Sequence, residues 1–232
     1  MNVFYSIPHG LSLTLGVVFL VTLLVLLEKS LAPRIRKWGD VYPAVLNFLV
    51  ILSKTVIPLA VLWSVYKLNP GSLGWVKGSF LQAFWKGVVL AALMMTFIFL
   101  YQKYSHLVFG TPYTSMGGRF LEEQISGAAI GIGISAALLN AFGEEIIFRG
   151  MLLPILSSYL GVFLAVICQS LIFTIYHFFP LQNALLLFIM GIFFGVGYLW
   201  SRSLLTPVLA HLIENGIPVL VFLIRLCKHQ SR

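Results

Sequence analysis

The feature that most restricts the possible folds of this chain is a series of apolar runs, each long enough to cross a bilayer. A transmembrane helix needs about 20 predominantly apolar residues, because the hydrocarbon core is about 30 Å thick. The sequence predicts an all-α, polytopic transmembrane helical bundle with about seven spans. The range is six to eight, because residues 151–159 could form an interfacial helix or end a tilted span. The predicted spans are Leu11–Leu27, Ala44–Tyr66, Phe80–Tyr101, Ile125–Phe148, Gly161–Phe178, Ala184–Trp200 and Leu204–Leu226.

Composition supports a membrane protein and excludes two other classes. Of the 232 residues, 59% are hydrophobic and 9% are charged, whereas soluble domains carry about 25% charged residues. The net charge of +8 comes from basic residues scattered between apolar runs, which is typical of membrane loops and argues against a nucleic-acid partner. Cys168 and Cys227 have no CxxC spacing, so a disulfide framework is not indicated. We expect a multi-pass protein of the cell membrane, surrounded by the lipid bilayer.

The distribution of polar residues divides the chain into two parts. Residues 1–110 are predicted to form accessory transmembrane helices, because their spans hold few polar residues, Asn47, Lys54 and Lys86 among them. The two lysines are expected to snorkel or to pair within the bundle. Residues 120–226 are predicted to form the working core, because polar side chains recur inside their apolar runs. Small residues also recur there, and they predict close helix packing in two clusters, Gly127/Gly131 with Ala129/Gly133, and Gly191, Gly195 and Gly197.

Two adjacent carboxylates and an arginine lie within the fourth apolar run, as Glu144-Glu145-x-x-x-Arg149. A charged side chain at membrane depth costs at least about 2.5–3.5 kcal/mol on insertion scales, so three together indicate a functional or structural requirement. In a helix, Glu145 and Arg149 share a face and can form an ion pair, whereas Glu144 points about 100° away. One interpretation is a structural ion pair beside an interfacial carboxylate; the other is an active site with Glu144 available for chemistry.

Three further polar residues lie inside later spans. His177 ends the stretch Phe173-x-x-x-His177, and His211 and Asn215 share a helix face in His211-x-x-x-Asn215. A turn is predicted near residues 159–161, which lie about equally far from Glu144 and His177, so the two side chains are expected at similar depth. Pro154 is expected to kink or end a helix. A lone intramembrane histidine is more often a packing residue, but several such positions near a carboxylate pair favour a site.

These residue types support hydrolysis. No Ser or Cys stands in a nucleophile motif, and no phosphate-binding glycine loop occurs. A carboxylate and a histidine, Glu144 and His177, can hold and deprotonate a water molecule. His211 and Asn215 can donate hydrogen bonds to a developing oxyanion. The set therefore predicts water attack on an amide inside a membrane.

The three motifs resemble, in order and spacing, those of the CAAX-protease and bacteriocin-processing (CPBP, or Abi) family of intramembrane proteases. The resemblance covers about residues 120–226. It implies that Glu144 and His177 activate the attacking water and that His211 and Asn215 stabilise the oxyanion. It also implies that Glu145 and Arg149 orient and support the site.

Whether a metal takes part is left open by the sequence. Some members of the family are described as metalloproteases and others as glutamate-type enzymes. Glu144, His177 and His211 are ligand types that zinc accepts. The HExxH helix of zincins is absent, which slightly favours a reaction without a metal.

The implied substrate is a membrane-anchored protein or peptide. Family members cleave prenylated CAAX tails, process peptides, or remove carboxy-terminal sorting signals, and the size of this chain favours a membrane-anchored peptide. Two alternatives belong to other classes. One is a small transporter that uses the polar cluster as a proton relay or cation site; the other is an immunity protein that binds a peptide without cutting it.

Three neighbouring polar residues are expected to have supporting or unrelated positions. Asn140 lies one turn before Glu144 and can form a hydrogen bond with it. Gln169 is predicted to form an interhelical hydrogen bond. Glu214 is expected to face the interface or another polar group rather than the attacking water.

Overall fold

The computed structural model describes residues 10–65, 79–110, 126–177 and 179–230, and within these ranges it contains helices and no strand. The predicted all-α class is confirmed. The boundary expected between the two parts of the chain, residues 111–119, lies outside the described residues. The elements are α1 (Gly10–Ile35), η2 (Arg36–Trp38), α2 (Val41–Ser64), α3 (Phe80–Tyr104), α4 (His106–Phe109), α5 (Gly127–Glu145), η4 (Ile146–Leu152), α6 (Leu153–His177), α7 (Leu181–Ser201) and α8 (Leu205–Gln230).

Among the described residues, five helical stretches are long and apolar enough to cross a membrane. One of them, Gly127–His177, has 51 residues and contains two of the predicted spans. The apolar part of α8, Leu205–Val221, is a shorter candidate. The observed helices therefore agree with a polytopic bundle of about seven spans. The five long stretches are Gly10–Trp38, Val41–Ser64, Phe80–Tyr104, Gly127–His177 and Leu181–Ser201.

The long stretch reverses direction at Gly161, as the predicted turn requires. Gly161 has φ 77°, a backbone conformation that side-chain-bearing residues rarely adopt. Of the two outcomes predicted for Pro154, a kink or a helix end, the helix end does not occur, because the helix continues through it. Proline cannot donate a hydrogen bond to the preceding turn, and the residues before it, Ile146–Leu152, form a π-helix in which the Leu153 amide donates to the Phe148 carbonyl. The wider turn accommodates the proline.

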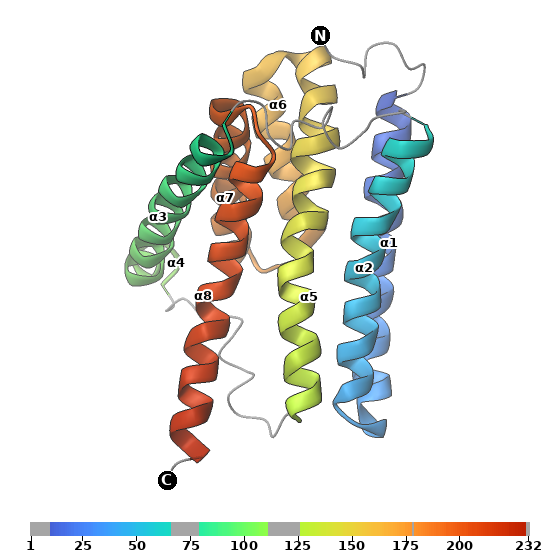
Figure 1. Ribbon diagram of the computed structural model, residues 1–232, viewed down its shortest axis with the longest axis vertical. Coiled ribbons are helices and arrows are strands. Elements are labelled where there is room, and N and C mark those ends of the chain that lie inside the picture. Colours follow the sequence, from blue (N-terminus) through green and yellow to red (C-terminus); the bar gives the residue numbers. More distant parts are fainter. Residues whose placement is uncertain (1–9, 66–78, 111–125, 178, 231–232) are drawn as a thin grey trace.

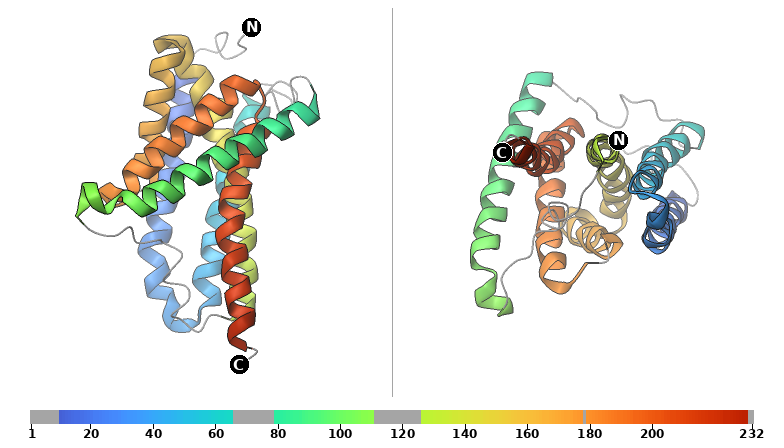
Figure 2. Two further views of the ribbon diagram at one scale, coloured as in Figure 1. Left: turned by 90° about the vertical axis from the view of Figure 1, so that its left-hand side faces the viewer. Right: turned by 90° about the horizontal axis from the view of Figure 1, so that it is seen from below.

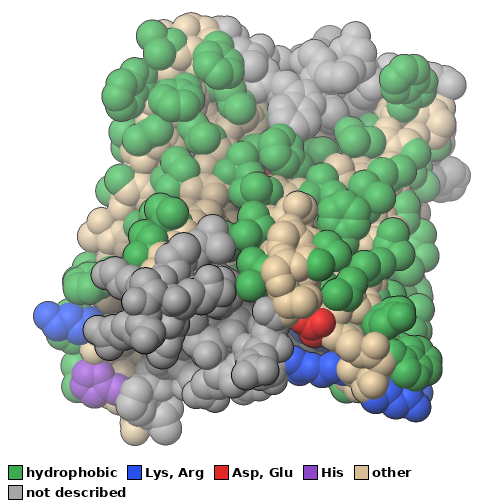
Figure 3. Space-filling model, turned by 60° about the horizontal axis from the view of Figure 1, so that its bottom comes forward, with side chains coloured by type: hydrophobic (Ala, Val, Ile, Leu, Met, Phe, Trp, Pro, Cys, Tyr) green, Lys and Arg blue, Asp and Glu red, His purple; other side chains and the backbone are tan. Residues whose placement is uncertain are grey.

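The helices form a bundle in which α1, α2, α5 and α8 run along the long axis, while α3 and α7 cross it obliquely (Figures 1 and 2). The connection between α1 and α2, which carries Arg36 and Lys37, lies at the same end as the carboxyl terminus (Figure 1). On the face shown in Figure 3, charged side chains lie toward the lower edge and the body is largely hydrophobic.

Glycine contacts confirm one predicted packing cluster and correct the other. A Cβ added at Gly191 would lie 3.0 Å from Ser170, and one at Gly195 would lie 3.0 Å from Gln169, so α6 and α7 pack closely there. At Gly127, Gly131 and Gly133 an added Cβ would meet nothing within 4 Å. The prediction of close packing is wrong for these glycines, because the face they occupy does not meet a neighbouring helix. The close approach of α5 occurs instead at Gly143, against α2.

Candidate active site

Glu144 and Glu145 end α5 and lie in the interior of the bundle, with exposed fractions of 1% and 0%. Arg149 in η4 and His211 in α8 are buried with them, at 0% and 4%. His177 stands at the end of α6, and its side chain keeps 18% of its surface exposed. The structure therefore brings residues from four elements, far apart in the sequence, into one buried cluster.

Glu145 forms the predicted ion pair with Arg149. Its Oε1 accepts a hydrogen bond from Arg149 Nη1 at 3.0 Å and lies 2.9 Å from His211 Nδ1. Because a carboxylate oxygen accepts, His211 Nδ1 is the donor in this contact. The ion pair is retained although the π-helix begins between the two residues. Glu145 therefore orients the imidazole of His211 and balances the charge of Arg149.

Arg149 is held by apolar rings as well as by polar contacts. Its guanidinium carbon lies 4.9 Å from the ring centroids of both Phe173 and Phe194, and such contacts stabilise a desolvated cation. Nη2 donates to the carbonyl oxygen of Gly191 in α7 at 3.1 Å. Phe194 also stacks on His211, with ring centroids 4.8 Å apart. Arg149 thus connects η4 with α6 and α7 around the carboxylate pair.

Glu144 meets a different set of partners, as expected from its direction on the helix. Its Oε1 accepts from Asn140 Nδ2 at 2.9 Å and from Lys54 Nζ at 3.3 Å. The hydrogen bond expected from Asn140 is confirmed. His177 Nε2 lies 3.6 Å from Oε1, and His211 Nε2 lies 3.9 Å from Oε2. Both imidazoles therefore face the Glu144 carboxylate, one toward each oxygen.

The backbone defines the tautomer of His177. Its Nδ1 lies 2.7 Å from the carbonyl oxygen of Phe173, which can only accept a hydrogen bond, so Nδ1 carries a hydrogen. In the neutral ring, Nε2 is then a proton acceptor, and this is the nitrogen that faces Glu144. Edge-to-face contacts with Phe173 and Tyr176, at 4.6 Å and 5.2 Å, fix the ring further.

Asn215 and Glu214 differ from the other members of the cluster. Asn215 Nδ2 donates to the carbonyl oxygen of Ala137 in α5 at 3.0 Å, about two turns before the carboxylates. Glu214 Oε2 lies 3.9 Å from His211 Nε2, so Glu214 faces another polar group, which is one of the two positions expected for it. The helix face that carries His211 also brings its neighbour three positions later within reach.

Lys54 is the site residue that sequence reasoning missed. It was expected to snorkel or to pair within the bundle, and it pairs with Glu144 across α2 and α5. The available signal was a lysine in the middle of an apolar span. Its partner depends on how α2 packs against α5, which the spacing of residues along the chain does not reveal.

Comparison with known families adds independent support. Residues 126–217 match a family model described as Rce1-like, type II CAAX prenyl endopeptidase. This segment is similar to the CAAX protease family. It contains Glu144, Glu145, Arg149, His177, His211 and Asn215, and it excludes Lys54. No curated protein and no solved structure gives a significant match to the chain. The family match and the apolar helices together indicate an integral membrane endopeptidase of the CAAX type.

The three residues of the CAAX protease segment that zinc could use do not fit a zinc site. His177 and His211 approach opposite oxygens of the Glu144 carboxylate, at 3.6 Å and 3.9 Å. The Lys54 ammonium lies 3.3 Å from one of these oxygens, where it would repel a divalent cation. Among the residues that the structure describes, no three His, Cys, Asp or Glu side chains form a group that could hold a metal ion.

Proposed function

We propose that this protein hydrolyses a peptide bond in a membrane-anchored protein or peptide, with Glu144 and His177 as the pair that activates water. The proposal is carried by one observation: His177 Nε2 faces Glu144 Oε1 at 3.6 Å, from two helices that both lie in the matched segment. Two proton acceptors at this separation can hold the two hydrogens of one water molecule between them. The burial of Glu144 keeps competing bulk water away from the carboxylate.

The proposed reaction has two proton transfers. Glu144 accepts a proton from the water while His177 Nε2 accepts a hydrogen bond from its other hydrogen. The water oxygen forms a bond to the carbonyl carbon of the substrate, and the carbonyl oxygen becomes an oxyanion. The C–N bond then breaks, and the proton held by Glu144 passes to the leaving amine. This returns Glu144 to its carboxylate form for the next turnover.

His211 and Asn215 are proposed to stabilise the oxyanion. His211 Nδ1 is committed to Glu145, so Nε2 can donate only when the ring is an imidazolium. The carboxylates of Glu144, Glu145 and Glu214 around the ring balance that positive charge. The Asn215 amide has two N–H groups, and its hydrogen bond to Ala137 uses one of them and fixes the orientation of the other.

The substrate class is proposed from the family description, which names CAAX prenyl endopeptidases, and from the burial of the site among apolar helices. A substrate whose scissile bond lies next to a lipid anchor or a hydrophobic segment would reach this depth. We propose the cell membrane as its location. The helices of residues 1–110 are proposed to accompany a catalytic core of residues 120–226.

The test is cleavage of a farnesylated peptide ending in a CAAX sequence, and of an unprenylated peptide with one transmembrane segment, by purified protein in liposomes. The variants are Glu144→Gln and His177→Ala, with Glu28→Gln in α1 as a matched control. We expect wild type and the control to cleave at least one peptide, and both site variants to lose at least about 10²-fold in kcat. Activity should persist with a chelator. Equal cleavage by wild type and Glu144→Gln would overturn the proposal.

A further inference from the structure

Lys54 carries a positive charge into the middle of the apolar helix α2, Val41–Ser64, where it is 6% exposed. A buried ammonium in a membrane span is costly unless it is paired and its hydrogens are used. The Lys54 ammonium is therefore stable in this position only if polar partners compensate its charge. The identity of these partners indicates the role of Lys54.

The partners of Lys54 form a closed set around the proposed catalytic carboxylate. Its Nζ lies 3.0 Å from Asn140 Oδ1 and 3.3 Å from Glu144 Oε1. Asn140 Nδ2 in turn donates to the same Glu144 oxygen at 2.9 Å. The ammonium also lies over the ring of Tyr176, 4.8 Å from its centroid. Each of the three polar side chains contacts the other two, so their positions are mutually dependent.

The backbone holds Lys54 in this place. A Cβ added at Gly143 would lie 2.7 Å from Thr55 Oγ1 and 3.3 Å from the carbonyl carbon of Lys54. The residue just before Glu144 is thus in close contact with the residue that carries the ammonium and with its neighbour. This contact sets the register of α2 against α5, and with it the distance between the two charges.

From these contacts we propose that Lys54 is a positioning residue of the active site, supplied by the amino-terminal helices from outside the segment that matches the family. The inference rests on the proposed role of Glu144. Lys54 and Asn140 together bind Oε1, which fixes the rotation of the carboxylate and leaves Oε2 toward His211. A positive charge beside Glu144 favours the carboxylate form, which can accept a proton from water. The helices of residues 1–110 are then part of the catalytic unit and not only accessory.

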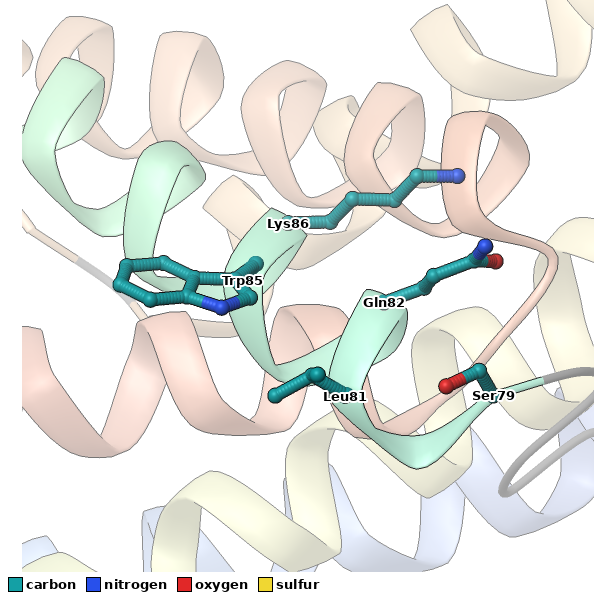
Figure 4. A pocket seen from close by; sticks show the side chains of 5 residues that line it. All are labelled: Ser79, Leu81, Gln82, Trp85 and Lys86. Carbon is teal, nitrogen blue, oxygen red and sulfur yellow. The ribbon is translucent and has the colours of Figure 1, made fainter.

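Lys86 offers a matched control within the same protein. It is also a lysine in an apolar helix, α3, and its Nζ donates to the Trp200 carbonyl oxygen at 3.2 Å and lies 5.1 Å from the Trp200 ring centroid. It lines a shallow hollow with Ser79, Gln82 and Trp85 (Figure 4). No member of the proposed catalytic set lines this hollow, so losing this charge should not affect the chemistry.

The first experiment compares Lys54→Met, Lys54→Arg and Lys86→Met with wild type, using the farnesylated and transmembrane peptides in liposomes. We expect Lys54→Met to lower kcat by about 10²-fold and to change KM by less than about threefold, because the substrate does not contact Lys54. Lys54→Arg, which restores the charge, should recover at least about a tenth of wild-type kcat, and Lys86→Met should stay within about twofold. A kcat of Lys54→Met within twofold of wild type would overturn the inference, as would equal losses in the Met and Arg variants.

The second experiment needs no activity and separates failure of this inference from failure of the proposed function. Tm is measured for wild type, Lys54→Met, Glu144→Gln and the double variant. Each single variant leaves a buried polar group without its partner, so the double variant should lose less than the sum of the two single losses, by on the order of 5 °C. Additive losses would overturn the pairing even if the protein cleaves peptides. Coupling in a protein that cleaves no peptide would retain Lys54 as the partner of Glu144 and refute the protease assignment.

Discussion

Arg149 and Gln169 donate to the same backbone oxygen, that of Gly191, from Nη2 at 3.1 Å and from Nε2 at 3.0 Å. A carbonyl oxygen has two lone pairs, and here both are used. The oxygen is accessible to two side chains because Gly191 packs its backbone directly against Ser170. One carbonyl of α7 therefore joins the charged cluster in η4 to a polar residue of α6.

Because Gln169 and Arg149 share the Gly191 oxygen, we expect substitutions at these two residues to lower the free energy of unfolding by unequal amounts. Gln169→Leu removes the donor to Gly191 O, whose Nε2 also contacts Val166 O and Ser170 Oγ, and leaves Arg149 paired. We therefore expect a loss of about 1–2 kcal/mol in the free energy of unfolding. Arg149→Met removes the partner of buried Glu145, and a loss of about 3–5 kcal/mol is expected. Thermal unfolding in one detergent measures both. A Gln169 variant that is less stable than the Arg149 variant would contradict this ranking.

Arg149→Lys tests whether a positive charge at position 149 is by itself enough to restore the stability lost in Arg149→Met. A lysine has one nitrogen and cannot reach Glu145 and Gly191 in the planar arrangement of the guanidinium. We expect Lys to restore less than half of the stability lost in Arg149→Met. Full recovery of stability by lysine would show that the planar arrangement of the guanidinium nitrogens does not matter at position 149.

Gly143→Ala is expected to separate α2 from α5. The new methyl group would lie 2.7 Å from Thr55 Oγ1, and overpacking of this kind costs about 1–3 kcal/mol. Since the same contact positions Lys54, activity should fall with stability. Adding Thr55→Ala removes the clashing oxygen and should recover part of both losses.

Gly133→Ala, in the same helix, is the control for the Gly143 substitution. An added Cβ there meets nothing within 4 Å, and alanine is favoured over glycine in a helix by about 1 kcal/mol. We expect unchanged or slightly higher Tm. A loss at Gly133 equal to that at Gly143 would place the effect in helix flexibility and not in the contact with Thr55.

Asp40, which lies outside the membrane-spanning segments, predicts that the stability of the protein depends on pH. Its carboxylate accepts a hydrogen bond from the Ser126 amide, and this bond lowers the pKa of Asp40 below its ordinary value of 3.8. A lowered carboxylate pKa stabilises the folded state above the unfolded pKa, and the contribution is lost as pH falls through the folded pKa. Asp40→Asn should therefore lower Tm at pH 7 and have little effect near pH 2. A Tm difference that stays constant from pH 7 to pH 2 would contradict this assignment.

The parts of the molecule that were predicted from the sequence depend on local geometry. The Glu145–Arg149 pair and the Asn140–Glu144 hydrogen bond follow from four-residue spacing, which any helical segment preserves. The turn at Gly161 was indicated by distances counted along the chain. The interhelical hydrogen bond of Gln169 followed from a polar amide inside an apolar span.

The parts that were missed depend on which helix faces meet. Lys54 could not be assigned to Glu144, because 90 residues separate them and only the α2–α5 contact joins them. Gly127 and Gly131 have the spacing of a packing motif, but in the part of the chain that the structure describes nothing lies within 4 Å of a Cβ added at either glycine. Pro154 was expected to kink or end a helix; the helix continues, and the π-helix before Pro154 accommodates the missing N–H donor. In each case tertiary packing decided among options that the local pattern allowed.

The unequal exposure of the two proposed water-activating residues affects the timing of the reaction. Glu144 is 1% exposed, whereas the His177 side chain, at the end of α6, keeps 18% of its surface accessible. Because the His177 side chain is the more exposed of the two, in the proposed reaction we expect water to reach the carboxylate past this imidazole. Hydration of the site, and not bond breaking alone, can then limit turnover. A bilayer that packs more tightly around the end of α6 would slow the enzyme without changing any residue in it.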